Sequence, residues 1–339
     1  MVTFTTMEDQ TRASLGSDLL NRSVCLLVSL RKLGVHRTVR REKISRILKN
    51  EGNTLPFPEQ TPRDPVQVDA DPQMVRILKV LFKSPEYDAI CRIDRKIGKY
   101  LQTRCLPSLL RKGAYLLPIP LIEEVDRALS NLAEQRKGLV RVLAGKFPQI
   151  VRESQRPLGG LFNPSDYPSA EQLEELFSMV VRYITFGVPD NLREASPLIF
   201  QREQNKAQSM WAEATQEVRQ VLRLGLLEFV DRLINGLNPR SDGKQKTFRT
   251  KLLSQITDFL GVFAARNITN DAELAQLVDR AKELLAGIDA KALSNDQDLR
   301  RTLQKGFNEV KQSLDAMVGK QPTRRILLSD EDPGPCEIS

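Results

Sequence analysis

Apolar residues recur at helical spacing along most of the chain. In residues 17–33 they lie three or four positions apart and Gly34 follows as a stop, which predicts a buried helix. Residues 38–50 predict a second, basic helix that ends near Gly52. Residues 53–72 contain five prolines, which lack a backbone donor and interrupt helices. This segment is therefore expected to be an extended loop.

Two further helices are expected in residues 73–160. The first runs from Pro72 to about Cys105, with a break at Ser84-Pro85, and the second covers 121–147 with a stripe of Val and Leu residues. Proline and glycine at 157–160 should end the second helix. Together they predict a helical hairpin region.

The region 161–319 is expected to be helical as well. Ser169 and Gln172 form a capping box that starts a helix reaching about Phe186. A long helix follows over 197–235, with alternating four- and three-residue steps between apolar positions, which are Trp211, Val218, Leu222, Gly225 and Phe229. This spacing is heptad-like and predicts antiparallel coiled-coil packing against 121–147.

Three amphipathic helices end this region. The first spans 248–266, and the next two are predicted to be capped by Asn270 with Glu273 and by Ser294 with Gln297. Residues 320–339 are polar, acidic near 330–332 and broken by proline and glycine, which predicts a disordered tail. Sustained period-2 alternation is absent. We therefore expect an all-α fold, an elongated helical bundle with long antiparallel coiled-coil-like helices and an N-terminal basic helical segment over 1–52.

Positive charge is concentrated in the first part of the chain. The net charge is +8, but residues 1–150 hold 26 basic and 16 acidic residues, and the remainder is slightly acidic. The densest stretch lies between 31 and 49 and contains Arg31, Lys32, Arg37, Arg40, Arg41, Lys43, Arg46 and Lys49. Such a stretch is a candidate contact for a polyanion or for an acidic protein surface.

Histidine and cysteine are too sparse for familiar catalytic or zinc sites. His36 is the sole histidine, and no two of the four cysteines have C-x-x-C spacing. A carboxylate-only metal site in a helical bundle is the form that an enzyme would take, but inward Glu-x-x-His motifs are missing. We predict no catalytic residue, no metal and no cofactor. The N-terminus lacks the pattern of a signal peptide, and no apolar run is long enough for a membrane span, so we expect a reduced, cytoplasmic protein with free thiols.

Two blocks, 246–293 and 19–39, contain features that are similar to those of a known protein family. Their features are Phe248-Arg249, Asn267-Ile-Thr269, the start Asp271-Ala-Glu-Leu274, and Gly287-Ile-Asp289. With these features the chain resembles a bacterial and phage family of unknown function that is encoded on mobile elements. Genes of that family often lie beside a MoxR/cobaltochelatase-like AAA+ ATPase and a von Willebrand factor A-domain protein. The resemblance implies those two partners but no active site.

Two hypotheses of function follow. In the first, the chain is a non-enzymatic helical adaptor or scaffold of an AAA+ ATPase and von Willebrand A-domain system. The acidic tail residues Asp330, Glu331 and Asp332 are then a candidate docking strip, because such domains present a metal to an acidic ligand residue. In the second, the chain is DNA-associated and contacts phosphates through 31–49. The sequence leaves a homo-oligomer open.

Overall fold

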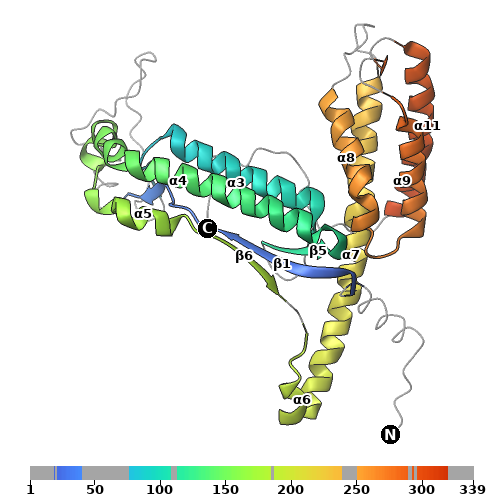
Figure 1. Cartoon of the computed structure of the whole chain (residues 1–339), viewed down its shortest axis with the longest axis horizontal. Coiled ribbons are helices and arrows are strands. Elements are labelled where there is room, and N and C mark those ends of the chain that lie inside the picture. Colours follow the sequence, from blue (N-terminus) through green and yellow to red (C-terminus); the bar gives the residue numbers. More distant parts are fainter. Residues whose placement is uncertain are drawn as a thin grey trace, which may run out of the picture. The chain divides into compact units, whose positions relative to one another are not determined.

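The computed structural model describes residues 19, 21–39, 76–107, 113–184, 187–238, 250–288, 292–293 and 296–319. Most of these residues are helical (Figure 1). The helices are α3 (Pro85–Arg104), α4 (Ile122–Leu158), α5 (Ala170–Leu176), α6 (Asn191–Ala195), α7 (Pro197–Leu237), α8 (Thr250–Arg266), α9 (Ala272–Leu285) and α11 (Gln297–Val318). The strands are β1 (Ser23–Leu30), β2 (His36–Thr38), β3 (Leu78–Val80), β4 (Leu106–Pro107), β5 (Ala114–Pro118) and β6 (Met179–Ile184). The expected predominance of helix is therefore confirmed, whereas the expectation of a purely all-α fold was wrong.

Strand β1 (Ser23–Leu30) occupies the middle of the segment 17–33, where a single helix was expected. It pairs antiparallel with β5, with Ser23 opposite Pro118 and Leu27 opposite Ala114. The apolar run in Ser23–Leu30 fits a buried strand as well as a helix, because a short apolar run has no distinctive period. Pairing with β5, about ninety residues further along the chain, decides between the two.

Strand β6 was also missed. The helix that was expected to reach Phe186 ends at Leu176, and β6 follows it. Val180, Val181 and Tyr183 favour extended structure because β-branched and aromatic side chains pack well on a sheet. The strand order in this four-stranded sheet is β4-β5-β1-β6, so β6 lies at one edge.

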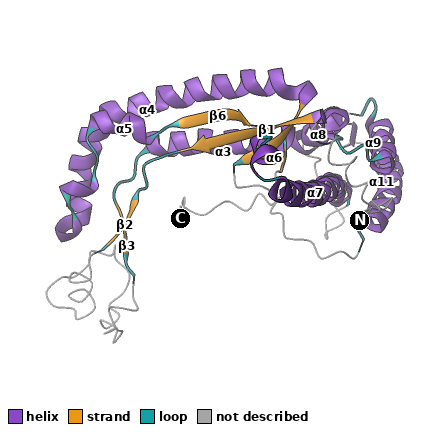
Figure 2. Cartoon of the chain, turned by 90° about the horizontal axis from the view of Figure 1, so that it is seen from below, coloured by secondary structure: helices purple, strands orange, loops and turns teal. Residues whose placement is uncertain are grey.

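Strands β2 and β3 form a separate antiparallel ribbon, in which His36 faces Val80 (Figure 2). The expected helix from Pro72 is thus wrong over Leu78–Val80, whereas its second part after Ser84-Pro85 is confirmed as α3. Thr38 ends β2, so the basic helix expected over 38–50 does not begin there. Residues 40–50, the Pro-rich segment 53–72 and the tail 320–339 lie outside the described residues.

The described residues form two compact units, and each has its own core. Unit 1 takes them from Met1–Val28, Ile97–Leu129 and Val180–Gly334, and unit 2 takes them from Ser29–Lys96 and Ser130–Met179. The N-terminal parts of β1 and α4 and the C-terminal part of α3 thus belong to unit 1, while the remainder of each belongs to unit 2.

The core of unit 1 is a bundle of α7, α8, α9 and α11 (Figure 1). The long helix over 197–235 is confirmed as α7, and its predicted stripe places Trp211, Val218 and Leu222 in this core. Helix α7 packs against α8 and α11. The coiled coil between 197–235 and 121–147 stays a prediction.

The core of unit 2 is rich in aromatic side chains. Phe82 meets Tyr87 and Phe147 edge to face, with ring centroids 5.6 and 5.7 Å apart. Phe147 comes from α4, which continues through Pro148 and ends at Leu158, as the Pro-Leu-Gly-Gly sequence predicted.

Helix starts follow the sequence closely but not always at the expected residue. The capping box of Ser169 and Gln172 is confirmed. The cap of α9 is Asp271 instead of Asn270, because Asn270 adopts a positive φ of 50° in the preceding turn. The cap of α11 is Asp296. No helix in the described residues is both long and apolar enough to cross a membrane.

Candidate functional site

Three of the eight predicted basic contact residues are described. The Arg31 side chain is exposed. The Lys32 ammonium lies 3.8 Å from the Cys91 sulfur, and the Arg37 guanidinium donates to the carbonyls of Gly34 and His36. Lys32 and Arg37 are partly buried, so Arg31 is the one exposed cation of these three. The remaining five, which are Arg40, Arg41, Lys43, Arg46 and Lys49, lie outside the described residues, as do Asp330, Glu331 and Asp332 of the tail.

The described cysteines are buried and form no disulfide bond with one another; they are Cys25, Cys91 and Cys105. Burial raises the pKa of the Cys105 thiol to about 12, although the nearby Arg266 acts in the opposite direction. A thiol that stays protonated at neutral pH is a poor nucleophile. Cys105 is therefore a packing residue and does not supply a reactive thiolate.

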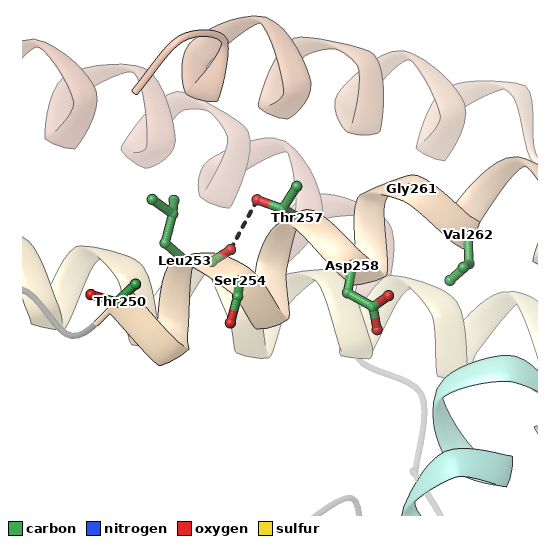
Figure 3. A pocket seen from close by; sticks show the side chains of 7 residues that line it. All are labelled: Thr250, Leu253, Ser254, Thr257, Asp258, Gly261 and Val262. Carbon is green, nitrogen blue, oxygen red and sulfur yellow. Dashed lines mark hydrogen bonds between the residues drawn. The ribbon is translucent and has the colours of Figure 1, made fainter. Parts of the chain in front are cut away.

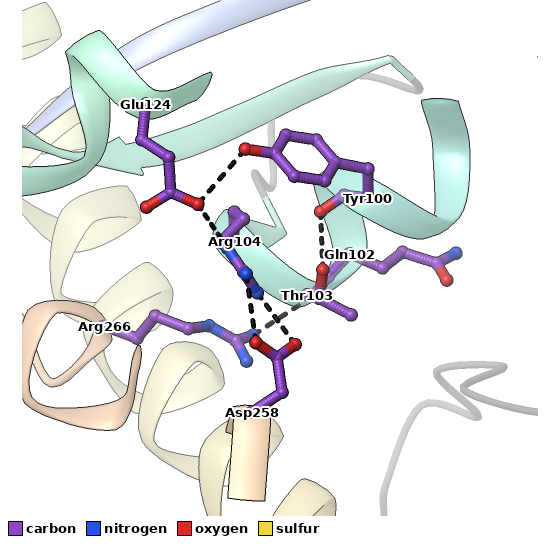
Figure 4. Close-up of polar contacts among 7 residues, drawn as sticks. All are labelled: Tyr100, Gln102, Thr103, Arg104, Glu124, Asp258 and Arg266. Carbon is purple, nitrogen blue, oxygen red and sulfur yellow. Dashed lines mark hydrogen bonds and ion pairs between the residues drawn. The ribbon is translucent and has the colours of Figure 1, made fainter. Parts of the chain in front are cut away.

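A polar cluster centred on Arg104 joins three helices of unit 1 (Figure 4). The Arg104 guanidinium makes two 3.0 Å hydrogen bonds to the Asp258 carboxylate of α8. Its Nε donates to Glu124 of α4 at 2.8 Å. The Tyr100 hydroxyl donates to the same Glu124 oxygen at 3.3 Å, and the Arg104 guanidinium carbon lies 5.6 Å from the centre of the Tyr100 ring. Fork-to-fork geometry makes Arg104 and Asp258 a strong pair.

The electrostatics of this cluster favour fixed charges over proton transfer. The Asp258 hydrogen bonds raise the pKa of the Arg104 guanidinium, which keeps its charge. Burial, together with the Glu124 carboxylate, raises the pKa of Tyr100 to about 12. General acid–base catalysis works best with groups that titrate near the operating pH. Arg104 and Tyr100 do not meet that condition. Their contacts with Glu124 and Asp258 instead hold the end of α3 against α4 and α8.

Arg266 lies beside this cluster and is buried in a different way. Its side chain ends at the carbonyls of Gln102 and Cys105, to which Nη2 donates at 3.3 and 3.2 Å. Its Nε is buried without a hydrogen-bond partner in the described part of the chain. Burial lowers the pKa of Arg266 to about 10, and the positive charge of Arg104 adds to this effect. Arg266 thus brings an incompletely satisfied positive charge into the interior of unit 1.

A cavity of about 230 Å³ lies next to Arg266, between α3, α7 and α8 within unit 1. Its lining combines three cations with two carboxylates and two phenylalanine rings. The lining residues are Lys99, Gln102, Thr103, Val221, Gly225, Glu228, Phe229, Arg232, Gln255, Asp258, Phe259 and Arg266. The Phe229 and Phe259 ring centroids are 5.0 Å apart. The cavity is the candidate binding site of unit 1.

An open groove along α8 is a weaker candidate (Figure 3). All its lining residues come from that one helix. The hydroxyls of Ser254 and Thr257 donate back to the carbonyls of Lys251 and Leu253 of the same helix. These hydroxyls are engaged in the helix itself, so the groove offers little to hold a ligand.

Unit 2 contains a buried arginine whose charge, unlike that of Arg266, is paired with a carboxylate in the described residues. Arg136 is 2 % exposed and makes three hydrogen bonds of 2.7 Å, to the Asp94 carboxylate and to the carbonyls of Phe177 and Arg31. A carboxylate and two backbone acceptors therefore compensate its charge. This arrangement ties α4 to α3 and to the segments next to β1 and β6.

Neither arginine was singled out from the sequence, where each looks like one more polar position of an amphipathic helix. No group of three or more potential metal-ligating His, Cys, Asp and Glu side chains occurs in the described residues. No family model, curated protein or solved structure matches the chain. The resemblance noted from the sequence therefore stays a prediction.

Proposed function

We propose that the chain is a non-enzymatic helical adaptor or scaffold of an AAA+ ATPase and von Willebrand A-domain system of a mobile element or phage. The sequence resemblance supplies the two partners. The structural observation that supports docking of a protein is the edge strand β6, on which Val180 and Tyr183 are 36 % and 45 % exposed.

An edge strand carries backbone donors and acceptors that another strand can pair with. In β6 these groups are combined with exposed apolar side chains and with the exposed Arg182. The Tyr183 hydroxyl donates to Asp126 at 2.8 Å, which fixes the position of its half-exposed ring. These properties suit β-augmentation by an extended segment of one of the two partners, where the backbone supplies affinity and side chains supply specificity.

Co-purification of the full chain with the neighbouring ATPase and A-domain protein tests this proposal. Val180→Lys places a charge on the edge strand and is expected to reduce recovery of the partner that binds β6. Val142→Lys is the matched control, since Val142 is a valine of similar exposure on α4. Absence of both partners from the wild-type complex would overturn the adaptor proposal. Equal recovery with both variants would overturn the role of β6.

The acidic tail has its own test within the same assay. Replacing Asp330, Glu331 and Asp332 by the corresponding amides removes the charges that would reach a metal in the A-domain. We expect recovery of the A-domain protein to fall while recovery of the ATPase is unchanged. Unchanged recovery of both would remove the tail from the docking surface.

A DNA-associated protein is the second candidate, favoured by the charge of residues 31–49 and by the exposed Arg31. Binding to a labelled duplex at two salt concentrations separates it from the adaptor, because phosphate contacts weaken steeply as salt rises. Changing Arg37, Arg40, Arg41 and Arg46 together to Ala should abolish such binding. Binding that does not depend on salt would speak against phosphate contacts.

A further inference from the structure

The charge on Arg266 needs a partner that the described chain does not provide. Its guanidinium has five N–H donors, and its described hydrogen bonds are those of Nη2 to Gln102 and Cys105. No carboxylate forms an ion pair with it in the described residues, since Asp258 directs both oxygens to Arg104. Burying a charge without a counter-ion is costly. An anion in the adjoining cavity would act as the counter-ion and compensate the free-energy cost of burying the charge.

The cavity wall beside Arg266 is aromatic and apolar. Phe259 lies under the Arg266 guanidinium, whose carbon Cζ is 5.7 Å from the centre of the ring. Phe229 packs against Phe259. Gly225 of α7 adjoins this wall, and a Cβ added there would lie 3.4 Å from the Phe259 ring. The surface is suited to a flat apolar group rather than to a fully hydrated ion.

Charge and size narrow the class of ligand further. Three cations face two carboxylates in the lining, so the cavity favours a single negative charge and repels a dianion through Glu228 and Asp258. A volume of about 230 Å³ equals roughly eight water molecules at ~30 Å³ each, which limits the ligand to a small molecule. Guanidinium binds carboxylate through paired hydrogen bonds. We propose that this cavity binds a small monocarboxylate with a flat apolar body.

One end of the cavity is exposed and polar, and the other end is buried. Lys99 and Gln102 are exposed residues, whereas Phe259 and Arg266 are buried. A ligand would therefore enter past polar side chains and place its carboxylate at Arg266, with its apolar body against the two rings. Arg232 is held by Glu228 of the same helix, which leaves Arg266 as the principal anchor.

Isothermal titration calorimetry of the full chain with benzoate tests this site. Benzoate has the proposed charge and shape, benzyl alcohol has the shape without the charge, and inorganic phosphate has charge without the apolar body. We expect saturable binding of benzoate alone. Failure of benzoate to saturate at millimolar concentrations would overturn the proposal, and so would phosphate binding as tightly as benzoate.

Two independent variants locate the site, and a third is the control. Arg266→Met removes the anchor, and Gly225→Leu fills the cavity from α7 while leaving Arg266 in place. Arg266→Met is expected to weaken benzoate binding at least tenfold, since a hydrogen bond to a charged group contributes about 1.5–3 kcal/mol, which corresponds to roughly tenfold or more. Gly225→Leu is expected to weaken it because the leucine side chain occupies space that the ligand needs. Arg280→Met changes an exposed arginine of α9 and should bind like the wild type.

Circular dichroism shows which variants are folded. Either Arg266→Met or Gly225→Leu, if folded, is sufficient to test whether benzoate binds in this cavity. Wild-type affinity in folded Arg266→Met would overturn the assignment of the anchor. Wild-type affinity in folded Gly225→Leu would overturn the assignment of the cavity. Should both variants unfold, protection of the Arg266 side-chain signals by benzoate in the wild type provides the remaining readout, and unchanged signals would overturn the site.

Discussion

Replacing Arg136 by Met should destabilise unit 2 strongly. The three 2.7 Å hydrogen bonds of Arg136 end at Asp94 and at the carbonyls of Phe177 and Arg31. Methionine retains the apolar stem but leaves the Asp94 carboxylate, 11 % exposed, without its cation. Removing one partner of a buried ion pair typically costs about 3–5 kcal/mol. We expect a loss in that range.

Urea denaturation followed by circular dichroism measures this loss, and a double-mutant cycle identifies its source. Arg136→Met with Asp94→Leu removes the stranded carboxylate and should recover part of the stability. Recovery stays incomplete because two backbone carbonyls still lack their donor. The carbonyl of the buried Phe177 costs about 1–3 kcal/mol, whereas water can replace the donor at the carbonyl of the exposed residue Arg31. Arg141→Met, an exposed arginine of the same helix, is the control. A loss below about 1 kcal/mol, or strict additivity in the cycle, would refute the reasoning.

Two further predictions concern single carboxylates. Hydrogen bonds from Lys146 and Ser84 lower the pKa of Glu86 to about 2, so its stabilising contribution is present above the ordinary glutamate pKa and is lost as the pH falls toward 2. In a carbon NMR titration, Lys146→Met should raise the Glu86 pKa, and an unchanged pKa would contradict this account. Asp271→Ala removes the cap of α9 and also the buried carboxylate that pairs with Arg223 at 2.8 Å, so it should cost about 3–5 kcal/mol in urea denaturation. Asp271→Asn should lose the ion pair but keep most of the cap contribution, which is about 1 kcal/mol. Equal losses for both variants would show that the charge matters more than the cap.

Local signals in the sequence were sufficient for many of the helices. The start of α7 at Pro197, the capping box of Ser169 and the end of α4 at Leu158 depend on neighbouring residues alone, and the structure confirms them. Strand β1 depends on a partner strand far along the chain, and the apolar spacing in Ser23–Leu30 did not distinguish it from a helix. Strand β6 had a usable signal in its β-branched residues, which the helical interpretation overlooked.

The cavity was beyond local reasoning for a different physical reason. Gly225 and Phe229 were recognised as part of a stripe on α7, but a stripe does not reveal where packing leaves a space. Arg266 looked like the last polar residue of an amphipathic helix. Its burial follows from the carbonyls of Gln102 and Cys105, which lie more than 160 residues earlier in the sequence. Only the fold brings these groups together.

The two buried arginines should respond differently to the same substitution. Arg136 has a carboxylate partner, so Arg136→Met leaves an unpaired charge behind. Arg266 has only carbonyl partners in the described residues, so Arg266→Met removes a charge whose desolvation was not compensated. It leaves two carbonyls without their donor, but one of them belongs to the exposed residue Gln102, where water can replace it. In ligand-free protein, Arg266→Met should therefore cost at least about 2 kcal/mol less than Arg136→Met. Equal losses in urea denaturation would mean that Arg266 is paired in solution, and the case for an anion in its cavity would fail with that result.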